Sequence, residues 1–153
     1  MRSRCVVFSQ WRWSVVMHDL CLCCGEPLEG RCEDGWHLSC IRGFFKSDRL
    51  PSISLDMETP HAHPKRDSPG TWSFIPGVQR KFSLHLERKA GDTARLTLIG
   101  RPQGYVLKPS TEAYPQLPSC EALTMRLARH FGISTVPFAL IRLADDTLAY
   151  ISK

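Results

Sequence analysis

Two kinds of segment are missing from this chain of 153 residues. No apolar run approaches the ~20 residues that a membrane-spanning helix needs, so we predict no membrane segment. No block of like charge is present either, because the basic residues behind the formal net charge of +5 are scattered. A solvated basic surface explains that balance better than a nucleic-acid-binding surface does. The length and the apolar fraction of 42% instead suit a globular domain with a real core.

A convincing export signal is missing as well. Residues 1–16 combine basic and apolar residues, but Ser9, Gln10 and Arg12 interrupt the apolar run and no small-residue cleavage site follows. We therefore predict that residues 1–16 are a disordered extension, that Met17 is the functional start, and that the protein is cytoplasmic. Thiols in that compartment are expected to be reduced.

Cysteine, by contrast, is concentrated near the N-terminus, since residues 17–47 hold five of the seven cysteines. Cys21 and Cys24 have C-x2-C spacing, and His37 and Cys40 have H-x2-C spacing. A thiolate pair on a tight turn, joined by an imidazole and a thiolate from a second turn, can complete a tetrahedral zinc site. The pattern predicts a small Cys/His-rich knuckle that could hold zinc. The alternative is a small cap in which reduced cysteines pack as apolar side chains.

Proline-rich sequence separates this knuckle from the rest of the chain. A short helix or turn that packs Phe44 and Phe45 is expected at 41–46. Residues 48–71 then contain four prolines, and proline removes amide donors and interrupts helices. We predict a linker there. His61 and His63 could bind metal, but a polar loop without a ligand is the better interpretation.

The remaining residues, 72–153, alternate between strand-like and helix-like patterns. Strands are expected at 82–87, 96–99 and 105–108, and a final hairpin at 136–152 around a turn at Asp145 and Asp146. The main helix is expected at 119–130, capped by Ser119. A packing stripe at four-residue spacing is predicted from Leu123, Leu127 and Phe131.

A glycine turn before one of these strands and a lysine at the end of another suggest phosphate binding. Gly77 tolerates positive φ, and exposed backbone amides at such a turn can bind phosphate oxygens. Lys108, at the end of the strand 105–108, could reach the same phosphates. The alternative is that the glycine belongs to an ordinary hairpin turn and that Lys108 is exposed to solvent. Glu121 is open to two interpretations too: a carboxylate favoured by the helix dipole in the first turn, or a partner of Lys108.

Six short segments sharpen this hypothesis, because they occur in one order: 76–84, 105–109, 114–118, 121–128, 136–143 and 148–151. In this order they resemble the HipA-type serine/threonine kinases, the toxin half of a bacterial toxin–antitoxin pair. The resemblance is closest to compact versions that lack an extra N-terminal subdomain, and it covers roughly residues 20–153.

The resemblance implies an α+β fold: a kinase-like N-lobe, with an antiparallel sheet and one main helix, preceded by the knuckle. It implies ATP with magnesium as cofactor and Glu121 as the partner of the strand lysine. The implied ATP-binding residues are Gly77, Val78, Gln79, Lys81 and Lys108. A DNA-binding antitoxin of the HipB type is the implied partner, and aminoacyl-tRNA synthetases are the implied substrates. The loop serine that the family can phosphorylate is replaced here, with Phe74 and Pro76 near its place.

The catalytic carboxylates of such kinases have no counterpart in this sequence, since Asp145 and Asp146 fall in a hairpin turn. We therefore expect residues 72–153 to be an N-lobe truncated before the catalytic lobe and inactive alone. An apolar face near Tyr150 and Ile151 is expected to be exposed. The alternatives are a non-catalytic module that pairs with a separately encoded kinase lobe or an antitoxin, and a zinc-knuckle nucleic-acid binder.

Overall fold

The computed structural model describes residues 20–53, 80–88, 93–98 and 104–153. They belong to two compact units, Met1–Leu50 and Pro51–Lys153. The predictions of an extension at 1–16 and of a linker over most of 48–71 lie outside the described residues. No helix in the described part of the chain is long and apolar enough to cross a membrane.

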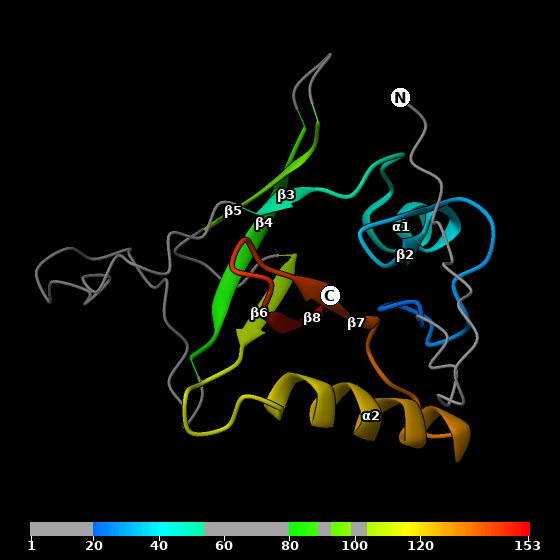
Figure 1. Ribbon diagram of the computed structural model, residues 1–153, viewed down its shortest axis with the longest axis vertical. Coiled ribbons are helices and arrows are strands. Elements are labelled where there is room, and N and C mark those ends of the chain that lie inside the picture. The colour runs from blue at the N-terminus through cyan, green and yellow to red at the C-terminus, as the bar shows by residue number, and fades with distance from the viewer. Residues whose placement is uncertain (1–19, 54–79, 89–92, 99–103) are drawn as a thin grey trace, which may run out of the picture. The chain divides into compact units, whose positions relative to one another are not determined.

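The first unit is a β-hairpin followed by a helix (Figure 1). Strands β1 (Cys32–Glu33) and β2 (Trp36–His37) pair antiparallel across a two-residue turn. Asp34 and Gly35 at that turn both have positive φ, 45° and 77°, as a type I′ hairpin requires. Helix α1 (Leu38–Phe45) follows directly, and it is longer at its start than the predicted 41–46.

The core of this unit is aromatic. The Trp36 ring lies 5.6 Å from the Phe44 ring and 5.4 Å from the Phe45 ring, measured between ring centroids. Trp36, Phe45 and Ile41 are fully buried, and Phe44 nearly so. Packing of Phe44 and Phe45 was predicted, whereas the central position of Trp36 was not.

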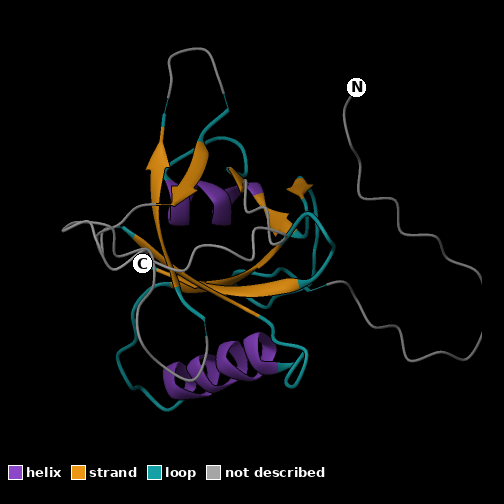
Figure 2. Cartoon of the chain, turned by 90° about the vertical axis from the view of Figure 1, so that its left-hand side faces the viewer, coloured by secondary structure: helices purple, strands orange, loops and turns teal. Residues whose placement is uncertain are grey.

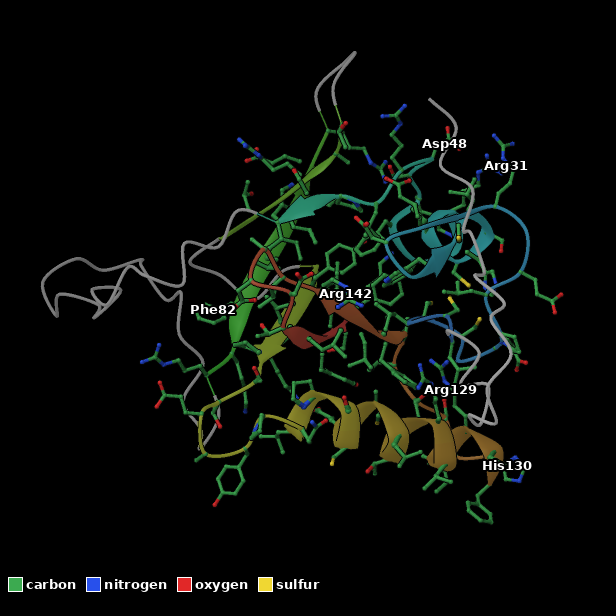
Figure 3. All side chains as sticks on the ribbon, in the orientation of Figure 1. Arg31, Asp48, Phe82, Arg129, His130 and Arg142 are labelled. Carbon is green, nitrogen blue, oxygen red and sulfur yellow. The ribbon has the colours of Figure 1, made fainter. Side chains whose placement is uncertain are left out.

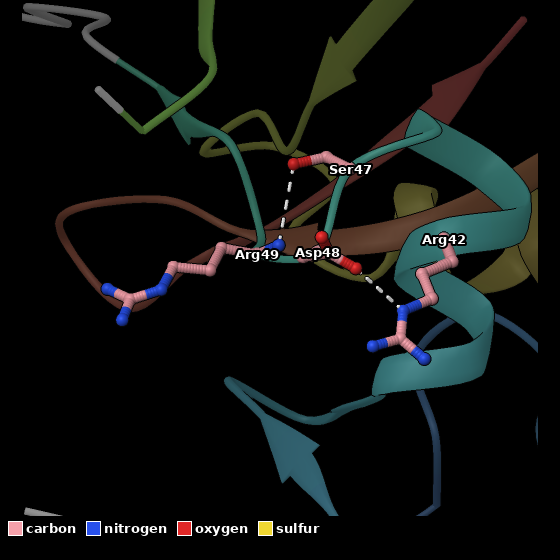
Figure 4. Close-up of polar contacts among 4 residues, drawn as sticks. All are labelled: Arg42, Ser47, Asp48 and Arg49. Atoms are coloured by element: carbon pink, nitrogen blue, oxygen red, sulfur yellow. Dashed lines mark hydrogen bonds and ion pairs between the residues drawn. The ribbon is translucent and has the colours of Figure 1, made fainter. Parts of the chain in front are cut away.

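Helix α1 ends in a left-handed turn that a backbone hydrogen bond closes, and polar contacts follow it (Figure 4). Lys46 adopts a left-handed conformation with φ of 56°, and its amide donates to the Arg42 carbonyl at 3.0 Å. Beyond it, Arg42 Nε donates to Asp48 Oδ1 at 2.8 Å, and the Arg49 amide donates to Ser47 Oγ at 3.4 Å. Both partners of the Arg42–Asp48 pair are well exposed, so that ion pair adds little stability.

The second unit contains a six-stranded sheet in the order β3-β5-β4-β6-β8-β7 (Figures 1 and 2). The strands are β3 (Ser52–Ile53), β4 (Phe82–Glu87), β5 (Arg95–Leu98), β6 (Tyr105–Pro109), β7 (Phe138–Arg142) and β8 (Leu148–Ser152). The α+β class is confirmed, but the prediction of an antiparallel sheet needs correction. Strand β3 pairs parallel with β5, so the sheet is mixed. The linker predicted at 48–71 is wrong at Ser52 and Ile53, which form this edge strand.

The register of the sheet separates two buried faces. Lys108 of β6 and Leu140 of β7 both lie opposite Tyr150 of β8, which places these three side chains on one face. Helix α2 (Leu117–His130) covers that face and contacts β7 and β8 (Figure 2). The other face carries apolar residues that are almost fully buried: Leu84, Leu96, Leu107, Ala139 and Ile151.

Burial on both faces corrects the expectation of an exposed apolar edge around Tyr150 and Ile151. These side chains are 2% and 0% exposed. Tyr150 is covered on the helix face, where the ring of Phe138 stacks on it, and Ile151 lies on the other. The exposed large apolar residues described in this unit are instead Tyr114, which precedes α2, and residues on α2 and in the loop that follows it.

Helix α2 turns a different side to the sheet from the one predicted. It begins at Leu117 with Gln116 as N-cap, so Ser119 is not its cap, and Pro118 lies in the first turn. Pro118 and Ala122 are its buried residues. Leu123, Leu127 and Phe131 are 56%, 49% and 77% exposed, so the predicted packing stripe faces solvent. The small, fully buried side chain of Ala122 permits a close approach of the helix to strands β7 and β8, which it contacts.

This orientation predicts a contrast between two substitutions on the same helix. Ala122→Leu should lower the free energy of unfolding by about 1–3 kcal/mol, because added volume must displace packed neighbours. Leu127→Gln should change it by less than about 0.5 kcal/mol, because an exposed position loses little. Urea unfolding of the two variants measures both values. A larger loss for Leu127→Gln than for Ala122→Leu would mean that the leucine side is the packed one.

Candidate functional sites

The first candidate site is built on a tight turn at Cys21–Gly25. The Gly25 amide donates to the Cys21 carbonyl at 2.8 Å, and Gly25 has φ of 83°, a conformation that suits glycine. The Leu22 amide donates to the Gly35 carbonyl at 2.8 Å, which ties this turn to the β1–β2 hairpin. Two loops remote in sequence are thereby fixed side by side.

The Cys21–Gly25 turn, strand β2 and helix α1 bring together the four predicted zinc ligands, Cys21, Cys24, His37 and Cys40. Their ligand atoms all lie within 4.8 Å of one another. Cys24 Sγ is 3.4 Å and Cys40 Sγ is 3.9 Å from His37 Nδ1. Three thiols and one imidazole are a donor set that tetrahedral zinc accepts. The four residues therefore lie close enough to bind a metal ion.

The imidazole of His37 is oriented by its second nitrogen. Nε2 lies 3.1 Å from the Pro27 carbonyl oxygen, which accepts a hydrogen bond if Nε2 carries the proton. Nδ1 then presents its lone pair to the sulfurs, which is the tautomer that metal binding needs. The Glu29 amide also lies 3.4 Å from Nε2. One tautomer cannot satisfy both contacts, and the shorter one favours a protonated Nε2.

The pKa values of two thiols in the cluster are shifted in opposite directions. Burial raises the pKa of Cys21, but hydrogen bonds from the amides of Cys24, His37 and Cys23 outweigh it and lower that pKa to about 7. Burial, followed by the nearby Cys23 and Cys21 sulfurs, raises the pKa of Cys40. Crowded thiols resist becoming thiolates together unless a cation compensates them.

Five described cysteines, Cys21, Cys23, Cys24, Cys40 and Cys120, form no disulfide bond. All three cysteines of the four-residue cluster are therefore available as ligands.

The second candidate site is an ion pair between Lys108 of β6 and Glu121 of α2. Lys108 Nζ donates to Glu121 Oε1, and the two side chains keep 21% and 25% of their surface exposed. Glu121 is the fifth residue of α2, and no acidic residue lies in the first turn. The first-turn dipole explanation therefore does not account for Glu121, whereas the partnership with Lys108 does.

A third residue, Tyr150, adjoins this pair. Lys108 Nζ lies 5.1 Å from the centroid of the Tyr150 ring. Burial raises the pKa of Tyr150 to about 12, with the Glu121 carboxylate adding to the rise and Arg129 opposing it. The phenol is therefore neutral at physiological pH. Sequence analysis missed this contact, although cross-strand pairing of 105–109 with 148–152 would have placed Tyr150 beside Lys108.

The other predicted ATP-binding residues are not joined to this pair by a described contact. Gly77, Val78 and Gln79 lie outside the described residues, so their role stays a prediction. Lys81 immediately precedes β4 and is half-buried. Its role in ATP binding also stays a prediction.

Comparison with known proteins identifies the second unit. A family model described as the HipA-like C-terminal domain matches residues 73–153, which is more than half of the chain. The chain belongs to the HipA family. The resemblance inferred from the six ordered segments is confirmed at this level, and it places the chain among proteins of toxin–antitoxin systems. No curated protein matches the sequence.

The residues matched by the HipA model include one of the two candidate sites and not the other. Lys108, Glu121 and Tyr150 lie inside the matched residues 73–153, whereas the Cys/His cluster lies before them. Family membership therefore bears on the ion pair, and the cluster has to be judged on its own geometry.

Proposed function

We propose that residues 72–153 form the ATP phosphate-binding lobe of a HipA-type serine/threonine protein kinase, the toxin of a type II toxin–antitoxin system. The observation that carries this proposal is the ion pair between Lys108 on β6 and Glu121 on α2. Protein kinases use a strand lysine for the phosphates and a helix glutamate to hold that lysine. Here the strand, the helix and both residue types agree with that arrangement inside a HipA-family match.

The surroundings of the pair suit a lysine that binds an anion. Partial burial strengthens its attraction to a phosphate relative to a fully solvated lysine. About a fifth of the Lys108 side chain remains exposed, so a ligand can still reach it. Glu121 and the Tyr150 ring hold the ammonium group in one place, which lowers the entropy lost on binding. The predicted contributions of Gly77, Val78, Gln79 and Lys81 belong to the same proposal.

Magnesium binding and activation of the substrate hydroxyl are assigned to residues other than those of this lobe. Within the described residues, the Cys/His cluster is the one group of three or more side chains that lie close enough to share a metal ion. Asp145 instead accepts hydrogen bonds from the Thr147 hydroxyl and amide, 2.6 and 3.0 Å away. These two bonds lower its pKa, and they stabilise the β7–β8 turn. We therefore propose that this lobe acts together with a second kinase lobe and transfers no phosphoryl group alone.

Partners follow from the same proposal. A HipB-type DNA-binding antitoxin is the proposed protein partner, and aminoacyl-tRNA synthetases are the proposed substrates. The rival function, a non-catalytic binding module, predicts binding to such a partner without nucleotide. A zinc-knuckle nucleic-acid binder would need a basic surface, and the net charge of +5 is modest.

The nucleotide-binding part can be tested with the full chain. Calorimetric titration with MgATP should give weak binding that Lys108→Ala weakens by roughly 10–100-fold, because a charge-assisted contact contributes about 1.5–3 kcal/mol. Lys46→Ala removes the same charge from an exposed position of the other unit and should leave the affinity unchanged. Equal affinity of the wild type and Lys108→Ala would refute the proposal.

We also propose that Cys21, Cys24, His37 and Cys40 bind one zinc ion with a structural role. The donor set, the convergence of the four ligand atoms and the orientation of His37 by the Pro27 carbonyl support zinc. Four protein ligands would close the coordination sphere, which is typical of structural rather than catalytic zinc.

A further inference from the structure

We infer that Tyr150 is a positioning residue for nucleotide binding, and that it fixes Lys108 as part of a stack in which two aromatic rings lie between two cations. The stack consists of Arg129, Phe138, Tyr150 and Lys108. This inference rests on the proposed role of Lys108 in ATP binding.

The stack is continuous in its geometry. Arg129 Cζ lies 4.2 Å from the centroid of the Phe138 ring. The Phe138 and Tyr150 rings are 6.0 Å apart between centroids and nearly parallel, with an interplanar angle of 12°. Lys108 Nζ lies 5.1 Å from the Tyr150 centroid. Both ends of the stack are therefore cations within the range in which the negative face of a ring attracts a positive charge.

Three strands and one helix contribute to this stack. Phe138 is on β7, Tyr150 on β8 and Lys108 on β6, and all lie on the sheet face that α2 covers. Helix α2 supplies Arg129, which Figure 3 shows near the C-terminal end of the helix. The same helix supplies Glu121, which pairs with Lys108. Helix and sheet are thus joined at both ends of one row of contacts.

Arg129 is itself held in place. Its Nε donates to Thr135 Oγ1 at 2.7 Å, and its second guanidinium nitrogen donates to the Val136 carbonyl at 3.0 Å. These bonds connect α2 to the loop before β7. A fixed guanidinium over Phe138 restricts the ring, and the stacked Phe138 restricts Tyr150. The position of Tyr150 then limits where the Lys108 ammonium group can lie.

The ring face, rather than the phenol oxygen, is the group that acts on Lys108. Tyr150 is 2% exposed, and its raised pKa keeps the ring neutral at physiological pH. A neutral ring offers its quadrupole to the ammonium group without neutralising it. Phenylalanine would preserve this face, whereas leucine would fill part of the volume without it.

The test uses the full chain and three substitutions. Tyr150→Leu should weaken MgATP binding several-fold, and Tyr150→Phe should retain the wild-type affinity. Lys108→Ala reports separately whether Lys108 binds nucleotide. A structural role alone would not distinguish leucine from phenylalanine once both variants are folded, so the rescue by phenylalanine is the informative comparison.

A second measurement needs no nucleotide. In a lysine-labelled NMR spectrum, the methylene protons next to the Lys108 nitrogen should be shifted upfield by the Tyr150 ring, relative to those of the exposed Lys46. The shift should persist in Tyr150→Phe and disappear in Tyr150→Leu. A Lys108 signal without that shift in the wild type would overturn the inference even if Tyr150→Leu fails to fold. If the shift is present but Lys108→Ala binds MgATP normally, the ring contact stands and the proposed function fails.

Discussion

Protein purified without chelator should contain one zinc ion per chain, and removing that ion should unfold the first unit, which holds the Cys/His cluster. The unit has a small core built around Trp36, Ile41 and Phe45, and domains of this size usually need a metal or disulfides for stability. Structural zinc contributes apparent binding free energies of about 10–16 kcal/mol in zinc-finger peptides. Elemental analysis measures the stoichiometry, and near-ultraviolet circular dichroism follows the aromatic core as a chelator is added.

The control for the zinc prediction lies in the second unit. Cys40→Ser should lose zinc, because the substitution removes one of four ligands, whereas Cys120→Ser should retain it, because Cys120 is an exposed free thiol outside the cluster. Protein with zinc at background level, and with Cys21, Cys24 and Cys40 freely titratable in the native state, would end the metal hypothesis. The cysteines would then be accessible thiols that bind no metal.

Incubation of the purified chain with radiolabelled ATP, magnesium and aminoacyl-tRNA synthetases should give no label above background. Lys108 and a phosphate-binding turn can position ATP, but transfer also needs metal-binding groups and a carboxylate near the attacking hydroxyl. Loss of one preorganised electrostatic group alone typically costs about 10²–10³ in rate. We therefore expect labelling below roughly 10⁻³ of that of an intact kinase of this kind.

Lys108→Ala is the matched control for this experiment. If the wild-type chain labels a protein and Lys108→Ala does not, the second lobe is unnecessary and the proposed division of labour is wrong. Addition of a separately expressed kinase lobe extends the test. Label that appears only with both components, and only with Lys108 present, is the result that the proposal predicts.

Local chemistry in the sequence was sufficient to predict that the four candidate ligands converge and to predict most of the strands. The C-x2-C and H-x2-C spacings selected Cys21, Cys24, His37 and Cys40, because neighbouring residues on a tight turn must converge. Alternating apolar residues predicted β4 and β6, because side chains of a strand alternate between two faces. The order of six short segments was enough to recognise the HipA family, and Glu121 could be proposed as the partner of Lys108.

Contacts between distant segments were decided by the tertiary structure alone. The sequence predicted the helix α2 from its periodicity, but it could not predict which side faces the sheet. Leu123 and Leu127 suit burial as well as Ala122 does. Packing of α2 against β7 and β8 buries Ala122 and leaves Leu123 and Leu127 exposed. Strand β3 could not be foreseen either, because its two residues acquire strand structure only by pairing with β5. The placement of Tyr150 beside Lys108 likewise depends on the register of β6 with β8, which no local pattern within either strand specifies.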